Sequence, residues 1–249
     1  MVVKAGKKAS CQQTITIPNP CLWSTESPNL YTVNTIIRQG KTIIDNQENV
    51  IGIREFHFEA ATGFYLNGIN QKIFGVCLHQ DGGPVGVAVP LAVWKRRLQT
   101  LKQIGANAIR TAHNPMDPCF YDLCDRMGFL VMDESFDTWT VAKPNGTQGY
   151  NLYFNEWWEA DTRDMVLRDR NHPSIILYSV GNEIRDKLDQ EDGQQRFLNQ
   201  RDLIHKLDST RPVTMALFRP NEMDVYTNGF ADLLDVIGQN YRENELVES

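Results

Sequence analysis

Residues 174–183, Ser-Ile-Ile-Leu-Tyr-Ser-Val-Gly-Asn-Glu, are the stretch that decides the fold of this chain. Their largely apolar part, residues 175–180, has the length and the β-branched and aromatic content of a strand buried on both faces, as in a parallel sheet. The strand pattern ends at Gly181, and an amide and a carboxyl group follow in Asn182 and Glu183. Such groups at the exit of a buried strand fit the active-site end of a (β/α)₈ barrel. Asn-Glu also suits the N-terminus of a helix, so this stretch alone leaves both interpretations open.

The composition of the chain excludes several classes of function. It has 249 residues, 41% of them hydrophobic and 22% charged, as in an ordinary globular protein with a core. The net charge of −6 and the lack of any block of Lys and Arg argue against a nucleic-acid partner. No apolar run reaches the roughly 20 residues of a membrane span, so no membrane partner is expected. The N-terminus shows no signal-peptide pattern, and the compartment, cytoplasmic or periplasmic, stays open.

Residues 1–58 have the pattern of a β-sandwich. Short strand patterns cover residues 14–17, 30–37, 41–44 and 50–58, and Pro, Gly and Asn turns separate them. Four or five strands are fewer than a complete sandwich needs. We therefore expect residues 1–58 to hold part of a β-sandwich that is cut at its N-terminal side.

From residue 59 onward the pattern alternates between strands and helices, which predicts parallel strands with right-handed crossovers. The expected strands cover residues 73–78, 106–110, 129–132, 175–180, 212–215 and 235–239. Polar residues end nearly every one of them, which favours a barrel over a doubly wound sheet with a single switch point and a Gly-rich phosphate turn. These residues are His79 and Asp81, His113 and Asn114, Asp133 and Glu134, Asn182 and Glu183, and Asn240 and Tyr241.

The number of strands predicts an incomplete barrel. Six strands fit into residues 59–249, whereas a complete (β/α)₈ domain takes about 250 residues. The expected fold is thus α/β, a (β/α)₈ TIM barrel truncated after about six strands and preceded by part of a sandwich. Because an open barrel exposes unpaired strand edges, association into a homo-oligomer is also expected.

Several motifs follow one another along the chain in a fixed order. Residues 20–31 contain Pro-Cys-Leu-Trp-Ser and Pro-Asn-Leu-Tyr, and residues 102–115 end in Ile-Arg-Thr-Ala-His-Asn-Pro. Residues 125–134 contain Asp-Arg-Met-Gly and Asp-Glu, and residues 168–183 contain Asp-Arg-Asn-His-Pro-Ser and Gly-Asn-Glu. This series resembles glycoside hydrolase family 2, the β-galactosidase/β-glucuronidase group, over about residues 18–241. The resemblance implies an immunoglobulin-like sandwich followed by a barrel.

The same resemblance implies a chemistry. Retaining glycosidases use two carboxyl groups about 5 Å apart, an acid/base and a nucleophile. Glu183 corresponds to the acid/base, which protonates the glycosidic oxygen and later activates water, and Asn182 would hold the 2-hydroxyl of the sugar. Trp139, just beyond the third strand, is positioned to reach the site and to stack on a sugar face, although aromatic residues of this spacing more often pack in the core. The remaining residues expected to bind or support the sugar are His79, Asp81, His113, Asn114, Asp133, Glu134 and Tyr241.

The resemblance places the nucleophile at the end of a seventh strand, after Asn240 and Tyr241. Glu243, Glu245 and Glu248 stand in no strand-like context, and none of them is assigned this role. The expectation is therefore an inactive fragment, without its nucleophile, of a retaining enzyme that hydrolyses terminal β-D-galactosides. A β-glucuronidase or a β-mannosidase is an alternative, and so is a non-catalytic carbohydrate-binding protein that keeps the sugar site.

No metal and no cofactor are expected. Some β-galactosidases of this family place Glu-x-His after the third strand as magnesium ligands, but residues 137–139 read Asp-Thr-Trp and offer too few ligands. Other residues have structural interpretations. Arg110 and Asp133 fit a buried ion pair that braces the mouth of the barrel. His113 also fits a structural role, and His172, at the opposite end of its strand, is expected to be structural.

Overall fold

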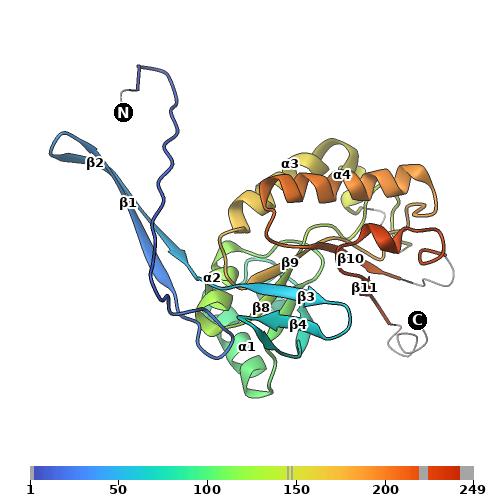
Figure 1. Ribbon diagram of the computed structural model, residues 1–249. Coiled ribbons are helices and arrows are strands. Elements are labelled where there is room, and N and C mark those ends of the chain that lie inside the picture. Colours follow the sequence, from blue (N-terminus) through green and yellow to red (C-terminus); the bar gives the residue numbers. More distant parts are fainter. Residues whose placement is uncertain (1–2, 145, 147, 219–223, 242–249) are drawn as a thin grey trace.

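The computed structural model describes residues 3–144, 146, 148–218 and 224–241, and its centre is a half-barrel sheet of six parallel strands (Figure 1). The spatial order β11–β10–β9–β8–β7–β6 follows the order of these strands along the chain. Every neighbouring pair is parallel, which confirms the expected α/β fold. The strands are β6 (Gly75–Leu78), β7 (Ala108–Thr111), β8 (Leu130–Glu134), β9 (Ile175–Asn182), β10 (Val213–Leu217) and β11 (Gly238–Gln239).

An α-helix makes each crossover between successive strands from β6 to β10. Helix α2 has a defined cap at each end. The Asp117 carboxylate accepts a hydrogen bond from the Cys119 backbone N–H at 2.9 Å, and Gly128 ends the helix with a φ of 69°. Among the described helices, none is both long and apolar enough to cross a membrane. The helices are α1 (Leu91–Gln103), α2 (Pro118–Met127), α3 (Phe154–Asp169) and α4 (Glu191–Leu207), with 3₁₀ turns at Gly83–Val85, Tyr150–Leu152 and Ala231–Leu233.

Side chains on the two faces of the half barrel pack into two separate cores. The larger core lies between the sheet and the helices, where Val131 and Tyr178 pack with Phe120 of α2. A three-stranded antiparallel sheet, β3 (Phe56–Glu59), β4 (Gly63–Leu66) and β5 (Ile69–Asn70), covers part of the other face. Its β3–β4 ladder runs across residue 58, the domain boundary that the sequence predicts. The second core consists of Trp23, Phe64, Leu66, Ala108, Leu130, Ile176 and Leu177.

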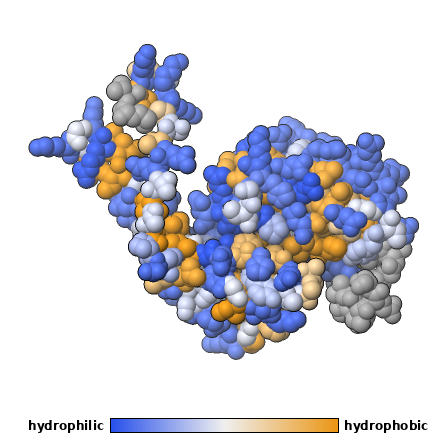
Figure 2. All heavy atoms as spheres, in the orientation of Figure 1, coloured by the Kyte–Doolittle hydropathy of each residue, from blue (hydrophilic) through white to orange (hydrophobic). Residues whose placement is uncertain are grey.

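Within the described residues, the chain before β3 forms only part of the expected sandwich. Strands β1 (Tyr31–Gln39) and β2 (Thr42–Ile51) make an antiparallel hairpin that projects away from the half barrel (Figure 1). Residues 14–17 form no strand, and this expectation was wrong because no described segment pairs with them. Figure 2 shows apolar surface along the hairpin, which carries the exposed side chains of Ile36, Ile37, Ile43 and Ile44.

Two side chains tie this first part of the chain to the amino end of the parallel sheet. Trp23 is fully buried, and its indole N–H donates to the Asp125 carbonyl oxygen at 2.8 Å. Arg54 donates from Nε to the Pro173 carbonyl oxygen at 2.7 Å and from Nη2 to the Ile175 carbonyl oxygen at 2.6 Å. These bonds satisfy backbone carbonyls at the start of β9, so the segment before β3 is fixed to the strand that carries Glu183 at its other end.

His172 strengthens the same end of the sheet. Its Nδ1 lies 2.6 Å from Oδ2 of Asp125, and both side chains are largely buried. Burial lowers the pKa of His172, but the hydrogen bond and the charge of Asp125 outweigh it, with help from Asp169 and Asp122, and the pKa lies above its ordinary value. The ion pair joins the segment that leads into β9 to the last turn of α2, and this agrees with the structural role expected for His172.

This ion pair predicts a specific dependence of stability on pH. Because the pKa of His172 is higher in the folded state, its protonation contributes stability that is complete below about pH 6.5 and is lost as the pH rises through the folded-state pKa. The free energy of unfolding of His172→Gln should therefore lie below that of the wild type at acidic pH, and the gap should narrow as the pH rises. Urea denaturation at a series of pH values measures this gap. His57→Gln, at an exposed position of β3, is the control, and a His172→Gln gap that is independent of pH would contradict the prediction.

Candidate active site

Polar residues that end the strands meet at one end of the sheet, because parallel strands all present their carboxyl ends there. Arg110 lies on β7, Glu134 ends β8, and Asn182 ends β9. Hydrogen bonds join these side chains to residues that follow the strands. We call the resulting group the strand-end cluster, and it consists of Arg110, His113, Glu134, Ser179, Asn182, Glu183 and Asn240.

Glu134 is the centre of the strand-end cluster, and its side chain is fully buried. Arg110 donates to its carboxylate from Nε and from Nη2, both at 2.9 Å, as a bidentate pair. The Ser179 hydroxyl donates to it at 2.6 Å, and Nδ1 of His113 lies 2.6 Å from its Oε1. Burial lowers the pKa of Arg110, but Glu134 outweighs that effect and the pKa lies above its ordinary value. The surrounding donors compensate the burial of the carboxylate.

Asn182 carries this network toward solvent. Its Oδ1 accepts from Nη2 of Arg110 at 2.8 Å and from Nδ2 of Asn240 at 3.1 Å, and its own Nδ2 donates to Oδ1 of Asp137 at 3.1 Å. The same Nδ2 of Asn240 donates to Oε1 of Glu183 at 2.9 Å. The amide of Asn182 is therefore held on both sides, and the carboxyl group of Glu183 is linked to the buried cluster through Asn240.

Glu183 has an unusual backbone conformation. Its φ of 51° lies in the left-handed region, which is uncommon for a residue with a side chain and concentrates at functional sites. Its backbone N–H donates to the Ala216 carbonyl oxygen at 2.8 Å, which fixes the turn after β9. Helix α4 begins only at Glu191, so Glu183 is not the cap of that helix. The half-buried carboxyl group is instead presented at the carboxyl end of the sheet.

Two histidines of the predicted site lie together. The rings of His79 and His113 meet edge to face, with their centroids 5.2 Å apart. His79 is exposed and His113 is half-buried. Because Nδ1 of His113 is bound to Glu134, the ring orientation is fixed, which agrees with a structural role for this histidine.

Three other predicted residues lie at the same end but outside the cluster. Asp81 is exposed, and its Oδ1 accepts from the Gly83 backbone N–H at 2.7 Å. Asn114 is exposed as well, and its side-chain amide donates to the carbonyl oxygen of Pro115. Tyr241 is 78% exposed. In the described part of the chain, no hydrogen bond joins any of the three to Asn182 or Glu183, so their roles in sugar binding remain proposals.

Asp133 lies on the opposite face of β8 from Glu134, since side chains alternate along a strand. It is fully buried, and its Oδ1 accepts from the Tyr121 hydroxyl of α2 at 2.6 Å. Burial and the neighbouring Asp169 raise the pKa of Asp133 well above its ordinary value. The expected Arg110–Asp133 ion pair is wrong, because Arg110 pairs with Glu134. A direct contact of Asp133 with a sugar does not fit this position on the side of the helices.

Trp139 also departs from its expected place. Its side chain is fully buried, and its indole N–H donates to the Val180 carbonyl oxygen at 2.7 Å. Its ring stacks on Phe154 at a centroid distance of 6.0 Å. Because the ring is fully covered by protein atoms, neither of its faces can stack on a sugar. Trp139 instead anchors the β8–α3 loop to β9.

Sequence patterns give only weak signals for the contacts of three residues that build the site. Ser179 is a single hydroxyl inside an apolar run, Asp137 stands in a polar loop, and Asn240 is expected at a strand end but without an assigned role. Their contacts join positions that are 45 to 58 residues apart in the chain. Only the parallel pairing of the strands brings these positions together.

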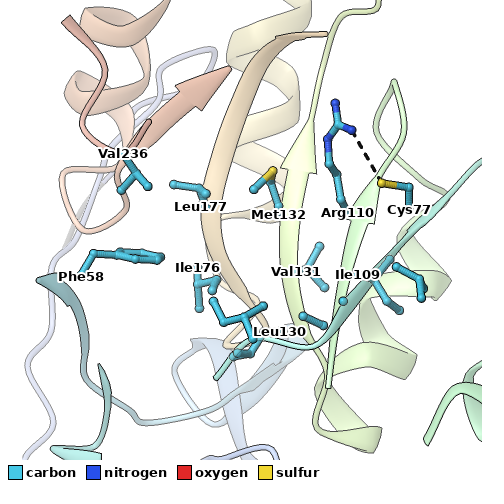
Figure 3. A pocket seen from close by; sticks show the side chains of 14 residues that line it. Phe58, Cys77, Ile109, Arg110, Leu130, Val131, Met132, Ile176, Leu177 and Val236 are labelled. Atoms are coloured by element: carbon cyan, nitrogen blue, oxygen red, sulfur yellow. Dashed lines mark hydrogen bonds between the residues drawn. The ribbon is translucent and has the colours of Figure 1, made fainter. Parts of the chain in front are cut away.

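The face of the half barrel that carries Arg110 also contains an apolar pocket of about 340 Å³ (Figure 3). Arg110 and Cys77 lie at its edge, with Nη1 of Arg110 3.7 Å from the Cys77 sulfur. The pocket does not fit a sugar, because few polar groups reach it. Its apolar lining includes Phe58, Leu130, Met132, Ile176, Leu177 and Val236.

Metal-ligand side chains gather elsewhere in the described residues. Asp122, Asp125 and His172 each place one ligand atom within 4.8 Å of the other two. This group lies at the amino end of β9, away from Glu183. The ion pair between Asp125 and His172 explains why these two side chains are close together.

Comparison with known proteins gives two matching family models. Residues 60–246 match the model described as glycosyl hydrolases family 2, TIM barrel domain, and residues 2–54 match the model described as glycosyl hydrolases family 2. Both matches agree with the fold and with the motifs of the sequence.

Individual relatives agree with these models. The chain is 39% identical to β-galactosidase BoGH2A of Bacteroides ovatus, over 98% of this chain and 32% of the relative. It is 43% identical to a putative β-glucuronidase of Formosa agariphila, over 94% of this chain and 22% of the relative. A solved glycosyl hydrolase family 2 member from Bacteroides cellulosilyticus superposes with a TM-score of 0.85 at 38% identity, over 91% of this chain and 28% of that one. The chain thus spans about a third or less of the length of these proteins.

The geometry of the cluster predicts a large loss of stability when the central ion pair is broken. Arg110→Met leaves the buried carboxylate of Glu134 without its guanidinium, and removal of one partner of such a pair costs about 3–5 kcal/mol. Urea denaturation measures this loss. Arg163→Met removes the exposed Arg163–Glu159 pair of α3 as the matched control, which should cost less than about 1 kcal/mol. Equal losses in the two variants would show that the Arg110–Glu134 pair does not stabilise the fold.

Proposed function

The chain belongs to glycosyl hydrolase family 2, and we propose that Glu183 is the acid/base of a retaining β-glycosidase of the β-galactosidase type. One observation carries this proposal. Glu183 stands in a left-handed conformation at the end of β9, half-buried, with its carboxylate bound by Asn240. The buried strand-end cluster therefore fixes where the carboxyl group lies, which acid/base catalysis requires.

In the proposed reaction Glu183 acts twice. Its carboxyl group first gives a proton to the glycosidic oxygen as the bond to the leaving group breaks, and its carboxylate then takes a proton from the attacking water. Asn182 is proposed to bind the 2-hydroxyl of the sugar, a contact that strengthens as the anomeric carbon gains positive charge.

The retaining route also needs a nucleophilic carboxylate about 5–5.5 Å from the acid/base. Glu134 does not suit this role, because it is fully buried and its oxygens are bound by Arg110, His113 and Ser179. We assign the nucleophile to none of the described residues.

The charges around the site support a neutral sugar. A uronic acid carries a carboxylate, which a site binds best with a cation that has no other partner. In the described part of the site, Arg110 is paired with Glu134, and Lys143 is paired with Asp137. The pairing of these two cations supports the proposed β-galactoside. It agrees with the name of the Bacteroides ovatus relative and differs from that of the Formosa agariphila relative.

The test compares the full-length protein with its Glu183→Gln variant on alkyl and aryl β-galactosides. Loss of a general acid should lower kcat/KM for methyl β-galactoside about 10²–10⁴-fold. The loss should be smaller for the dinitrophenyl galactoside, whose leaving group departs without a proton. Glu156→Gln, in the first turn of α3, is the control and should leave both rates unchanged.

Other outcomes would favour the other candidates. Faster turnover of nitrophenyl β-glucuronide or β-mannoside than of the galactoside would overturn the choice of sugar. Binding of galactose without turnover of any of the three would favour a carbohydrate-binding protein without catalysis. An equal loss of rate for good and poor leaving groups in Glu183→Gln would exclude the acid role of this residue.

A further inference from the structure

Asp137 occupies an unassigned position next to the proposed acid/base. It lies three residues after β8, in the loop that leads to α3, and its side chain is 45% exposed. Through Oδ1 its carboxylate accepts a hydrogen bond from Nδ2 of Asn182 at 3.1 Å and another from Nζ of Lys143. Burial raises the pKa of Asp137, but these two hydrogen bonds outweigh it, so the pKa lies below its ordinary value and the group is an acceptor at neutral pH.

The contacts of the Asn182 side chain, including the one to Asp137, limit how its amide can turn. Asn182 is only 3% exposed, so a small edge of the side chain is available to a ligand. Arg110 and Asn240 are both donors and fix which side of the amide carries its oxygen. The NH₂ group has two donor protons. Because Asp137 binds one of them, it sets the direction in which the other points.

The loop that carries Asp137 is itself fixed against the strand and loop of the acid/base. Asp186, three residues beyond Glu183, is almost fully buried. Its carboxylate accepts from the backbone N–H groups of Thr140 and Val141, both at 3.2 Å, and from the Thr140 hydroxyl. Together with the bond from Trp139 to β9, these contacts keep the β8–α3 loop in place relative to Glu183.

We propose that Asp137 is a positioning residue that orients the amide of Asn182 toward the sugar. This inference rests on the proposed function, in which Asn182 binds a hydroxyl group in the transition state. Asp137 acts through Asn182 and not by a contact of its own with the reacting atoms. Lys143 neutralises Asp137 but does not touch Asn182 in the described structure, so its contribution is smaller.

A double-mutant cycle in the full-length protein tests the proposal. Asp137→Ala should lower kcat/KM for a β-galactoside about 10²-fold, since a misplaced contact of about 1 Å costs this much. Asn182→Ala should lower it by at least as much, and the double variant should be no slower than Asn182→Ala alone. Asp137→Asn keeps an acceptor oxygen for the amide of Asn182 and should recover most of the rate. Glu159→Ala, which removes an exposed ion pair of α3, is the control and should have no effect.

A measurement without turnover separates this inference from the proposed function. The side-chain amide protons of Asn182, followed by NMR, should exchange faster with solvent in Asp137→Ala than in the wild type or in Glu159→Ala. Faster exchange in a protein that hydrolyses no glycoside would leave the positioning role standing and remove the proposed function. Unchanged exchange, or losses in kcat/KM that multiply in the double variant, would overturn the positioning role while leaving Glu183 as the acid/base.

Discussion

The buried carboxylate of Glu134 is the constraint on which the carboxyl end of the sheet depends. It is fully buried, so it must be surrounded by donors, and Arg110, His113 and Ser179 supply them from β7, from the segment after β7 and from β9. Arg110, held in this way, also donates to Asn182. One buried charge thus fixes the relative positions of three strand ends, and the polar residues near solvent take their places from it.

The amino end of the sheet has a different chemistry. There Trp23, Arg54 and His172 bind backbone carbonyls and the Asp125 carboxylate, and they fix the first part of the chain to the start of β9. These contacts serve stability and involve no group that is open to a substrate. The division agrees with a general property of barrels, in which the carboxyl ends of the strands carry the chemistry and the amino ends carry the packing. Strand β9 joins the two ends, because it begins next to His172 and ends in Asn182.

The relatives share the fold but carry the names of different enzymes. Proteins that are 39% and 43% identical to the chain are described as a β-galactosidase and as a putative β-glucuronidase. A fold that is common to such relatives does not by itself determine which sugar is bound. The choice of sugar depends on the charged residues and loops around the strand ends. In the described residues, the paired charges of Lys143 and Asp137 lie next to Asn182, and we propose them as one such feature.

The sequence by itself determined the order of strands and helices, the polar residues at the strand ends, and the place of Asn182 and Glu183 at the carboxyl end of β9. These features are local, because neighbouring residues in the chain determine hydrophobic periodicity, helix caps and strand ends. It did not determine which of two adjacent acids faces the site, so Arg110 was paired with Asp133 and not with Glu134. It also left open whether Trp139 stacks on a sugar or packs in the core, and it placed residues 14–17 in a strand. Only the tertiary structure decided these points. Which face of a strand a side chain occupies, whether a loop aromatic is buried and whether a strand finds a partner all depend on residues far away in the chain. Arg110, for example, is bound to Asn182, which lies 72 residues further along the chain.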